Sequence, residues 1–465
     1  GLSGSGSAGA GVGSGAKEVG SATASSGGPA SPVRAADHVE LSPRGRSLIL
    51  WSEEPVRRAR KEGKESTPCF VSLWDLRGGK MGGTFEAECT AECPTCTRGG
   101  LLVQLSSEEE ILFVADHSTF RAFQLPGGGK IYEKPLPPAF TGYDLGPGDR
   151  RVLLRTEDGQ GELLDAKSGK RTGKFQLVED GIGRAFGGSW DSSGRYLVLS
   201  GDEAYSRSLP PMQIRDGRTG ALLRTIKVEG AASPHFIGTG SRFVIFNDEG
   251  LFGIADAATG ATDVLRKGEL APPGPRQSWG SLSPDDRLFA ISGADSRLEV
   301  WDLGKRTRKE LLAPVESEWT SYPQISPDGR VIALVRDRAV EMVDVDGASP
   351  GRKIPLAEGE LSLSVHGEWG NDGLFHVRRG AALVAYGADA KERSRRDLGD
   401  ADAALSWSAD RRFLVLSGRD VRVIRMRDFQ EIRIALREKD GRIEGEVAGG
   451  ADAAAPAAFF GDEGN

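Results

Sequence analysis

The 465-residue sequence predicts an all-β fold of radially arranged four-stranded sheets, a β-propeller, and three observations lead to this prediction. A pattern of turn, apolar run, turn and apolar run recurs along the chain, as in "LSPDDRLFAISGADSRLEVWDLGKRTRKELL" at 282–312. No segment shows the apolar spacing of a convincing amphipathic helix. Spacings of 46, 46, 46, 43 and 43 residues separate equivalent turn positions, namely Gly148, Gly194, Gly240, Asp286, Gly329 and Asp372. A fixed period in this range is typical of a solenoid or a propeller, and short antiparallel strands favour the propeller.

Within one copy, the turn is followed by a β-branched or aromatic run that predicts a strand, and a second turn and run predict another. An inner strand before these two and an outer strand after them complete four strands. The second run ends in an acidic residue in five copies, at Asp165, Asp216, Asp256, Asp302 and Asp344. In three copies a hydroxyl residue and a glycine follow, as in "DAKSG", "DGRTG" and "DAATG". We expect these aspartates to accept local backbone N–H bonds while the glycine adopts positive φ.

The number of blades follows from the number of copies. Nine copies are visible, whereas propellers usually have four to eight blades. The sequence therefore predicts a single large ring of about eight blades with a partial copy at one end, or an unusually large ring. We expect the ring to close by pairing early and late strands, because an unpaired edge invites aggregation.

Three segments divide the chain. Residues 1–35 are rich in glycine, serine and alanine and are expected to form a disordered linker, because they offer too little apolar surface to fold. Residues 36–450 carry the repeats, and residues 451–465 are expected to be a disordered tail. The chain begins without methionine, so we expect a signal peptide, a lipid anchor or another domain upstream.

Two short motifs suggest a family. At "LEVWDL" (298–303) and "FVSLWDL" (70–76) the chain resembles the WD-repeat family, and "SPDG" at 326–329 is similar to a turn common in its bacterial members. The resemblance covers residues 38–450 and implies the fold rather than a function. In the eukaryotic pattern a Gly-His pair completes a buried hydrogen-bond network in each blade. None of the five histidines here belongs to such a pair, so the resemblance implies looser, bacterial WD-like blades.

Composition argues against two classes of protein. Sixty basic and 67 acidic residues give a net charge of −7, whereas nucleic-acid binders normally carry an excess of positive charge. No apolar run approaches the roughly 18 residues of a membrane-spanning helix. We therefore expect neither a nucleic-acid partner nor a transmembrane segment in this chain.

The four cysteines lie within 28 residues, at Cys69, Cys89, Cys93 and Cys96. "CTAECPTC" matches the iron–sulfur spacing of radical S-adenosylmethionine enzymes, but those present it from an α/β barrel that this sequence does not predict. We expect Cys69 to open the third strand of blade one and the other three to lie in the connection to blade two. The loop between strands two and three shares a face with that connection, so all four thiols can converge. Two disulfides, one structural four-thiolate zinc site, or four independent thiols are the alternatives.

Function is expected to reside in surface loops on this same face. The sequence predicts a non-catalytic scaffold or sensor that binds another protein, with candidate contacts in the loops Glu53–Pro68 and Asp202–Gln213 and in neighbouring connections. These candidates are Arg57, Arg58, Arg60, Lys61, Tyr205, Leu209, Trp279 and Trp319. The alternatives are an envelope-associated lipoprotein or, less favoured given five scattered histidines, a propeller hydrolase or quinoprotein. Both the cytoplasm and the bacterial cell envelope are compatible with these features.

Overall fold

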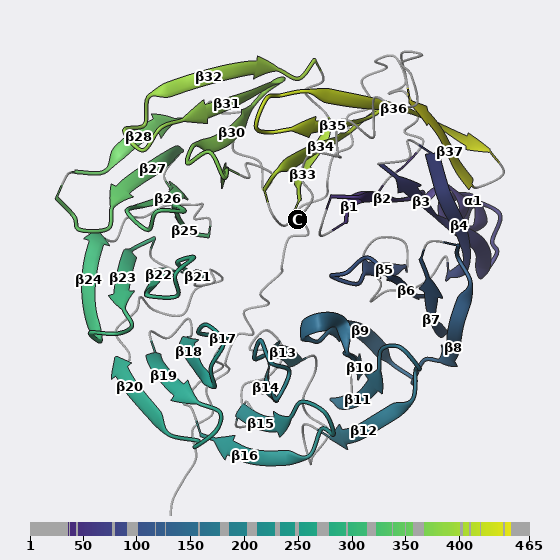
Figure 1. Ribbon diagram of the computed structural model, residues 1–465, viewed down its shortest axis with the longest axis horizontal. Helices are drawn as coiled ribbons and strands as arrows, with labels where there is room; N and C mark the ends of the chain where they lie inside the picture. The colour runs from purple at the N-terminus through teal and green to yellow at the C-terminus, as the bar shows by residue number, and fades with distance from the viewer. Residues whose placement is uncertain are drawn as a thin grey trace, which may run out of the picture. The chain divides into compact units, whose positions relative to one another are not determined.

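The computed structural model describes most of the region between residues 36 and 447. The described residues are 36, 38–42, 45–76, 80–90, 101–116, 118–125, 127–156, 159–176, 186–201, 212–227, 233–246, 251–266, 279–293, 296–313, 322–336, 338–348, 350–356, 367–399, 403–408, 411–418, 420–439 and 442–447. Within them the chain forms nine antiparallel sheets that follow one another around a ring (Figure 1). The predicted all-β propeller is confirmed, and each of the nine sequence copies is a blade.

The strands follow one another along the chain without crossovers, and the first strand of each blade lies innermost in the ring (Figure 1). Blades one to three consist of β1 (His38–Leu41), β2 (Ser47–Trp51), β3 (Ser66–Asp75), β4 (Lys80–Thr90), β5 (Leu102–Leu105), β6 (Ile111–Ala115), β7 (Thr119–Gln124), β8 (Lys130–Pro135), β9 (Phe140–Leu145), β10 (Arg151–Thr156), β11 (Gln160–Asp165) and β12 (Arg171–Gln176). Blades four to six consist of β13 (Phe186–Trp190), β14 (Tyr196–Gly201), β15 (Met212–Asp216), β16 (Leu222–Ile226), β17 (Ser233–Phe236), β18 (Arg242–Phe246), β19 (Phe252–Asp256), β20 (Thr262–Arg266), β21 (Trp279–Leu282), β22 (Leu288–Ser292), β23 (Leu298–Asp302) and β24 (Thr307–Leu312). Blades seven to nine consist of β25 (Gln324–Ile325), β26 (Val331–Arg336), β27 (Ala339–Asp344), β28 (Arg352–Pro355), β29 (Glu368–Trp369), β30 (Phe375–Arg379), β31 (Ala382–Tyr386), β32 (Glu392–Asp397), β33 (Ala404–Trp407), β34 (Phe413–Ser417), β35 (Val421–Arg425), β36 (Glu431–Lys439) and β37 (Arg442–Val447). A short 3₁₀ turn, η1 (Pro147–Asp149), and one α-helix, α1 (Glu54–Lys61), complete the described elements.

The predicted aspartate turns form as expected. Each of the five aspartates is the last residue of the third strand of its blade. In blade four, the Asp216 carboxylate accepts hydrogen bonds from the backbone N–H and the hydroxyl of Thr219, at 2.8 and 2.9 Å, and Gly220 has φ of 73°. These hydrogen bonds outweigh the effect of burial and hold the pKa of Asp216 below its ordinary value. The motif therefore encodes the turn to the outer strand within each blade.

Apolar side chains of the middle strands fill the space between neighbouring blades. At the junction of blades five and six, the ring of Trp301 stacks on that of Phe252, with centroids 4.3 Å apart, and Phe289 packs beside both. Trp301 belongs to the motif "LEVWDL", so the WD-like tryptophan is an inter-blade packing residue. Because both faces of a middle strand are covered by neighbouring blades, β22 is buried along its whole length and is mostly apolar.

The ring closes differently from the expectation. Within the described residues, blades one and nine share no hydrogen-bonded strand pair, so the predicted pairing of early and late strands is wrong. Closure is achieved by side-chain packing, because Leu48 and Trp74 of blade one form a single apolar cluster with Val423 and Ile434 of blade nine. Blade nine also has a fifth strand, β37, whose Ile443 enters that cluster. The β36–β37 hairpin thus extends blade nine over blade one (Figure 1).

The expectation that the chain has no helix is also wrong. Residues 54–61, which we expected within a loop, form α1 between β2 and β3. Pro55 lies in its first turn, where a missing N–H costs nothing, and Val56 and Ala59 supply a narrow buried side. A helix of eight residues with a single apolar stripe and several charged residues is too short for its apolar periodicity to be recognised in the sequence.

We predict that replacing Ile443 with alanine lowers the free energy of unfolding by about 2–5 kcal/mol, because its side chain is only 1% exposed in the closure cluster. Urea denaturation measures this effect. The matched control is Leu222→Ala on an outer strand, where the side chain is 52% exposed and the change should be within about 0.5 kcal/mol. Equal unfolding midpoints for the two variants would show that β37 does not hold the ring closed.

Candidate partner-binding face

The face predicted to bind a partner carries the connections between strands two and three. In antiparallel blades with sequential strands, those connections and the links to the next blade emerge on the same side of the ring. In blade one this connection, residues 52–65, contains α1. The site is therefore built on a helix held by the ring rather than on a loop.

Helix α1 has an apolar side that fixes it and a basic side that faces solvent. Val56, 4% exposed, packs in the same cluster as Trp51 and Val71 of blade one and as apolar residues of blade two. On the other side, the predicted contact residues Arg57, Arg58, Arg60 and Lys61 are all exposed. Three of them lie in the last turn, where their positive charges interact favourably with the negative end of the helix dipole. The structure thus brings together the four basic residues of the predicted site on one short helix.

Acidic residues surround the start of α1. Arg57 lies 3.8 Å from both Glu53 and Glu54, in contacts that are loose and mostly exposed. Glu53 also accepts a hydrogen bond from the His38 ring at 2.6 Å, and that ring stacks on Trp51 with centroids 4.6 Å apart. The pair of His38 and Glu53 was not foreseen from the sequence, because the two are fifteen positions apart with strand β2 between them. It ties the first strand of the ring to the start of α1.

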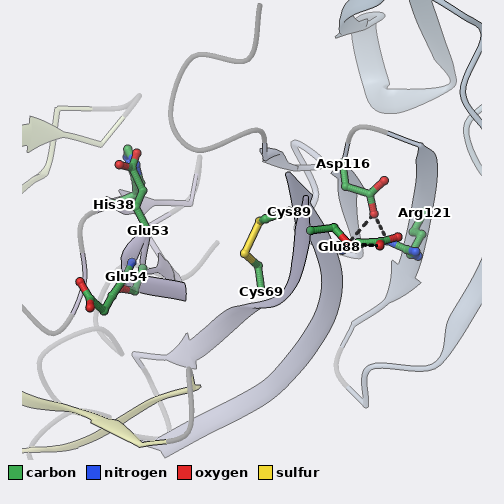
Figure 2. Close-up of a disulfide and its surroundings, with 10 residues drawn as sticks. His38, Glu53, Glu54, Cys69, Glu88, Cys89, Asp116 and Arg121 are labelled. Atoms are coloured by element: carbon green, nitrogen blue, oxygen red, sulfur yellow. Dashed lines mark hydrogen bonds and ion pairs between the residues drawn. A yellow bond between two sulfur atoms is a disulfide. The ribbon is translucent and has the colours of Figure 1, made fainter. Parts of the chain in front are cut away.

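A disulfide lies beside the helix in the core of blade one. Cys69 of β3 and Cys89 of β4 are bonded, with Cα atoms 5.8 Å apart, and both are at most 2% exposed (Figure 2). In the strand register Cys69 faces Ala87 and Cys89 faces Thr67, so the bond joins a diagonal pair on one face of the hairpin. That face also contains Val56 of α1 in the same apolar cluster. The disulfide therefore supports the part of blade one on which α1 rests.

This bond decides part of the cysteine prediction. It confirms the disulfide alternative for one pair, whereas Cys93 and Cys96 lie outside the described residues. A sulfur in a disulfide is not a thiolate, so two of the four ligands needed for the zinc alternative are removed. Within the part of the chain that the structure describes, no group of three or more histidine, cysteine, aspartate or glutamate residues could hold a metal ion.

The expected position of Cys89 is corrected. We placed it in the connection to blade two, but it lies within the long strand β4. The sequence contains a signal for this, because apolar and acidic residues alternate from Phe85 to Cys89. Phe85, Ala87 and Cys89 are buried while the two glutamates between them are exposed, as strand periodicity requires.

A buried carboxylate links this hairpin to blade two. The side chain of Asp116, between β6 and β7, is fully buried and pairs with Arg121 (Figure 2). It also accepts hydrogen bonds from the backbone N–H groups of Ser118, Thr119 and Glu88, at 2.8, 2.7 and 3.2 Å. Burial alone would raise the pKa of Asp116, but these hydrogen bonds and Arg121 hold it below its ordinary value of 3.8. Since Glu88 belongs to β4, the carboxylate ties blade one to blade two next to the disulfide.

The remaining predicted contacts are not placed by the structure. Tyr205, Leu209 and Trp319 lie outside the described residues, and Trp279 is described only as the first residue of β21, without its side chain. The loop Asp202–Gln213 is described only from Met212. The described site therefore consists of α1 and its support in blade one.

Comparison with known proteins relates the chain by its fold alone. No protein-family model matches it, and neither does any curated protein. Among solved structures, BamB from Moraxella catarrhalis is 16% identical, with 77% of this chain and 94% of that chain covered and a TM-score of 0.43. Dihydro-heme d1 dehydrogenase NirN in complex with DHE is also 16% identical, with 75% and 73% covered and a TM-score of 0.46. The Dos1 propeller is 10% identical, with 84% and 93% covered and a TM-score of 0.48.

These structures are similar in architecture, and identities of 10–16% carry nothing about activity or partner. The WD-repeat resemblance has no matching family model behind it and stays a prediction. Among the described residues, no helix has the length and apolar character that crossing a bilayer requires.

We predict that peptide mapping under non-reducing conditions links Cys69 to Cys89. Removing this bond by Cys69→Ala/Cys89→Ala should lower the free energy of unfolding by about 3 kcal/mol, because the bond closes a loop with a sequence separation of 20. The matched control is Cys93→Ala/Cys96→Ala, which leaves the bond intact. A map that links Cys69 to Cys93 or to Cys96 would contradict the structure.

We predict that Asp116 stabilises the fold in a pH-dependent manner. Its pKa is lower in the folded than in the unfolded chain, so its contribution is complete above the unfolded value near 3.8 and is lost as the pH falls through the folded value. The stability difference between wild type and Asp116→Asn, measured by urea denaturation, should be largest at neutral pH and shrink below about pH 4. A difference that stays constant from pH 7 to pH 3 would rule out an ionised Asp116 as the stabilising group.

Proposed function

We propose that this protein is a non-catalytic scaffold that binds a protein partner through the face carrying α1. The observation that carries the proposal is the anchored, basic helix inserted between β2 and β3. Most strand-two to strand-three connections need only a tight turn, and Gly380 and Ala381 are enough in blade eight. Blade one instead has fourteen residues between Trp51 and Ser66, and Val56 among them packs in the apolar cluster that contains the Cys69–Cys89 disulfide.

The partner is proposed to present an acidic surface to this helix. Arg57 is 48% exposed along its side chain, and Arg58, Arg60 and Lys61 are exposed as well. Arginine guanidinium groups bind carboxylates in a bidentate manner and are enriched at interface contacts that contribute strongly to binding. Because salt screens exposed charges beyond about 8–10 Å, the helix acts on a partner that approaches this face closely.

The proposed place of action is an oxidising compartment. Structural disulfides form and persist in the bacterial periplasm and outside the cell, and are rare in the reducing cytosol. Of the two locations compatible with the sequence, the bond between Cys69 and Cys89 favours the cell envelope. This also fits the looser bacterial type of WD-like propeller that the sequence resembles.

The test is a fourfold charge removal on α1. Partners are captured with the wild-type chain and purified, and their binding to Arg57→Gln/Arg58→Gln/Arg60→Gln/Lys61→Gln is measured by surface plasmon resonance. Glutamine keeps the helix propensity while removing the charge. We expect the association rate at low salt to fall at least about tenfold, because exposed interface charges act mainly on association.

The matched control removes four exposed cations from the outer hairpin of blade three, in Lys167→Gln/Lys170→Gln/Arg171→Gln/Lys174→Gln. It changes the net charge equally, but its turn lies on the opposite face. Unchanged binding by the control supports the α1 face. If both variants lose the same amount of binding, the loss is explained by net charge alone. If the α1 variant binds as well as the wild type, the binding site lies elsewhere.

A further inference from the structure

A cleft between blades six and seven lies on the face opposite α1, where strand one turns into strand two and strand three into strand four. Its volume is about 770 Å³, within the range of small-molecule sites. Five cationic side chains line it: Arg287, Lys305, Arg308, Lys309 and Arg330. Three carboxylates do so as well: Asp302, Asp344 and Asp346. The lining therefore carries an excess of positive charge.

The carboxylates are already engaged within their own blades. Asp302 accepts hydrogen bonds from the backbone N–H groups of Gly304 and Lys305, at 3.1 and 2.9 Å, and these contacts lower its pKa. Asp344 pairs with Arg352 at 2.6 Å. Asp346 accepts a hydrogen bond from the backbone N–H of Ala348 at 2.9 Å. Each of the three carboxylates therefore has at least one partner other than the cationic side chains that line the cleft.

Arg330 differs from its counterpart in the preceding blade. Arg287 and Arg330 follow the equivalent turns "SPDD" and "SPDG". In blade six, Arg287 lies 3.4 Å from Asp302 at the end of the third strand. In blade seven, the corresponding Asp344 is bound by Arg352 instead. The guanidinium of Arg330 makes no ion pair with any described carboxylate.

Lys309 holds the place that an aromatic ring fills at two other junctions and that Arg224 fills over Gly260 between blades four and five. In blade two, Tyr132 lies over Gly169 of the next blade and donates a hydrogen bond to the carbonyl of Ala166 at 3.1 Å. The ring of Phe175 covers Gly220 in the same way one junction later. Between blades six and seven it is the Lys309 side chain that reaches the turn glycine, Gly347.

A lysine is thinner than a ring and ends in a charge, so this junction stays open and cationic. Lys309 makes no ion pair with a described carboxylate. Gly329, beside Arg330 in the lining, has open space on its side-chain face, because an added Cβ would meet nothing within 4 Å. Among the five lining cations, Lys309 of blade six and Arg330 of blade seven are therefore the ones without an ion pair to a described carboxylate.

We propose that this cleft binds a small organic phosphate, with Lys309 of blade six and Arg330 of blade seven as its principal phosphate contacts. Arginine and lysine are the side chains that bind phosphate oxygens most strongly, through charge-assisted hydrogen bonds. The volume exceeds that of a phosphate ion and leaves room for an organic body between the blades. This site is independent of the proposed protein-binding face.

The experiment is isothermal titration calorimetry of the full chain with fructose 1,6-bisphosphate, which carries two phosphate groups on a small body. We expect saturable binding with a Kd below about 1 mM, and at least about a tenfold weakening in Lys309→Gln/Arg330→Gln, equivalent to 1.4 kcal/mol. The matched control, Lys167→Gln/Lys174→Gln, lies in blade three, and its affinity should equal that of the wild type. Thermal unfolding confirms that each variant is folded.

Three results would overturn the proposal. The first is that fructose 1,6-bisphosphate does not bind the wild type in a saturable manner. The second is that the control variant loses as much affinity as the cleft variant. In the third, citrate binds as tightly as the bisphosphate, which would make the cleft a site for any polyanion. None of these results bears on partner binding by the α1 face, which is measured separately, so the two proposals can fail independently.

Discussion

Every blade of this ring depends on the packing of blade nine against blade one. The other eight junctions join neighbours that the chain already connects, so local contacts form at a low cost in chain entropy. The closing junction joins segments about 370 residues apart, and no strand pairing supports it among the described residues. Apolar side chains from both blades form one buried cluster there, and β37 adds a fifth strand to the contact. Without it, the apolar faces of blades one and nine would both be exposed to water.

The same junction geometry, repeated around the ring, explains where the molecule is specialised. Most contacts between blades use interchangeable apolar residues, as in the stack of Trp301 on Phe252. Polar side chains that cross a junction are more specific, since Asp116 accepts an N–H from the neighbouring blade and Trp369 donates to the Gln324 carbonyl at 3.1 Å. Between blades six and seven, Lys309 reaches the turn glycine that an aromatic ring covers at two other junctions, and a cleft lies there. The junctions therefore differ from one another through individual side chains, while the apolar packing between blades stays similar around the ring.

The two faces of the ring carry different chemistry. One face carries α1, a basic helix whose Val56 packs in the same apolar cluster as Cys69 and Cys89. The opposite face carries tight turns in which Asp165, Asp216 and Asp256 accept local backbone N–H bonds, and the cationic cleft lies between two of its blades. Antiparallel blades place α1 and the cleft on opposite faces, because successive connections alternate between the two faces of the ring.

The sequence by itself determined the repeat, the all-β class and the aspartate turns, because each of these rests on interactions within a few residues. Asp216, for example, binds a hydroxyl residue three positions later. The basic residues of the candidate site were also visible, although the helix that presents them was not, since its buried stripe is defined only by contact with blades one and two. Tertiary structure alone decided that Cys89 pairs with Cys69 and that Ile443 closes the ring. It also decided that Asp344 pairs with Arg352 of the outer strand, whereas the equivalent Asp302 lies near Arg287. These outcomes depend on which distant side chains meet across a junction, and a local pattern does not contain that information.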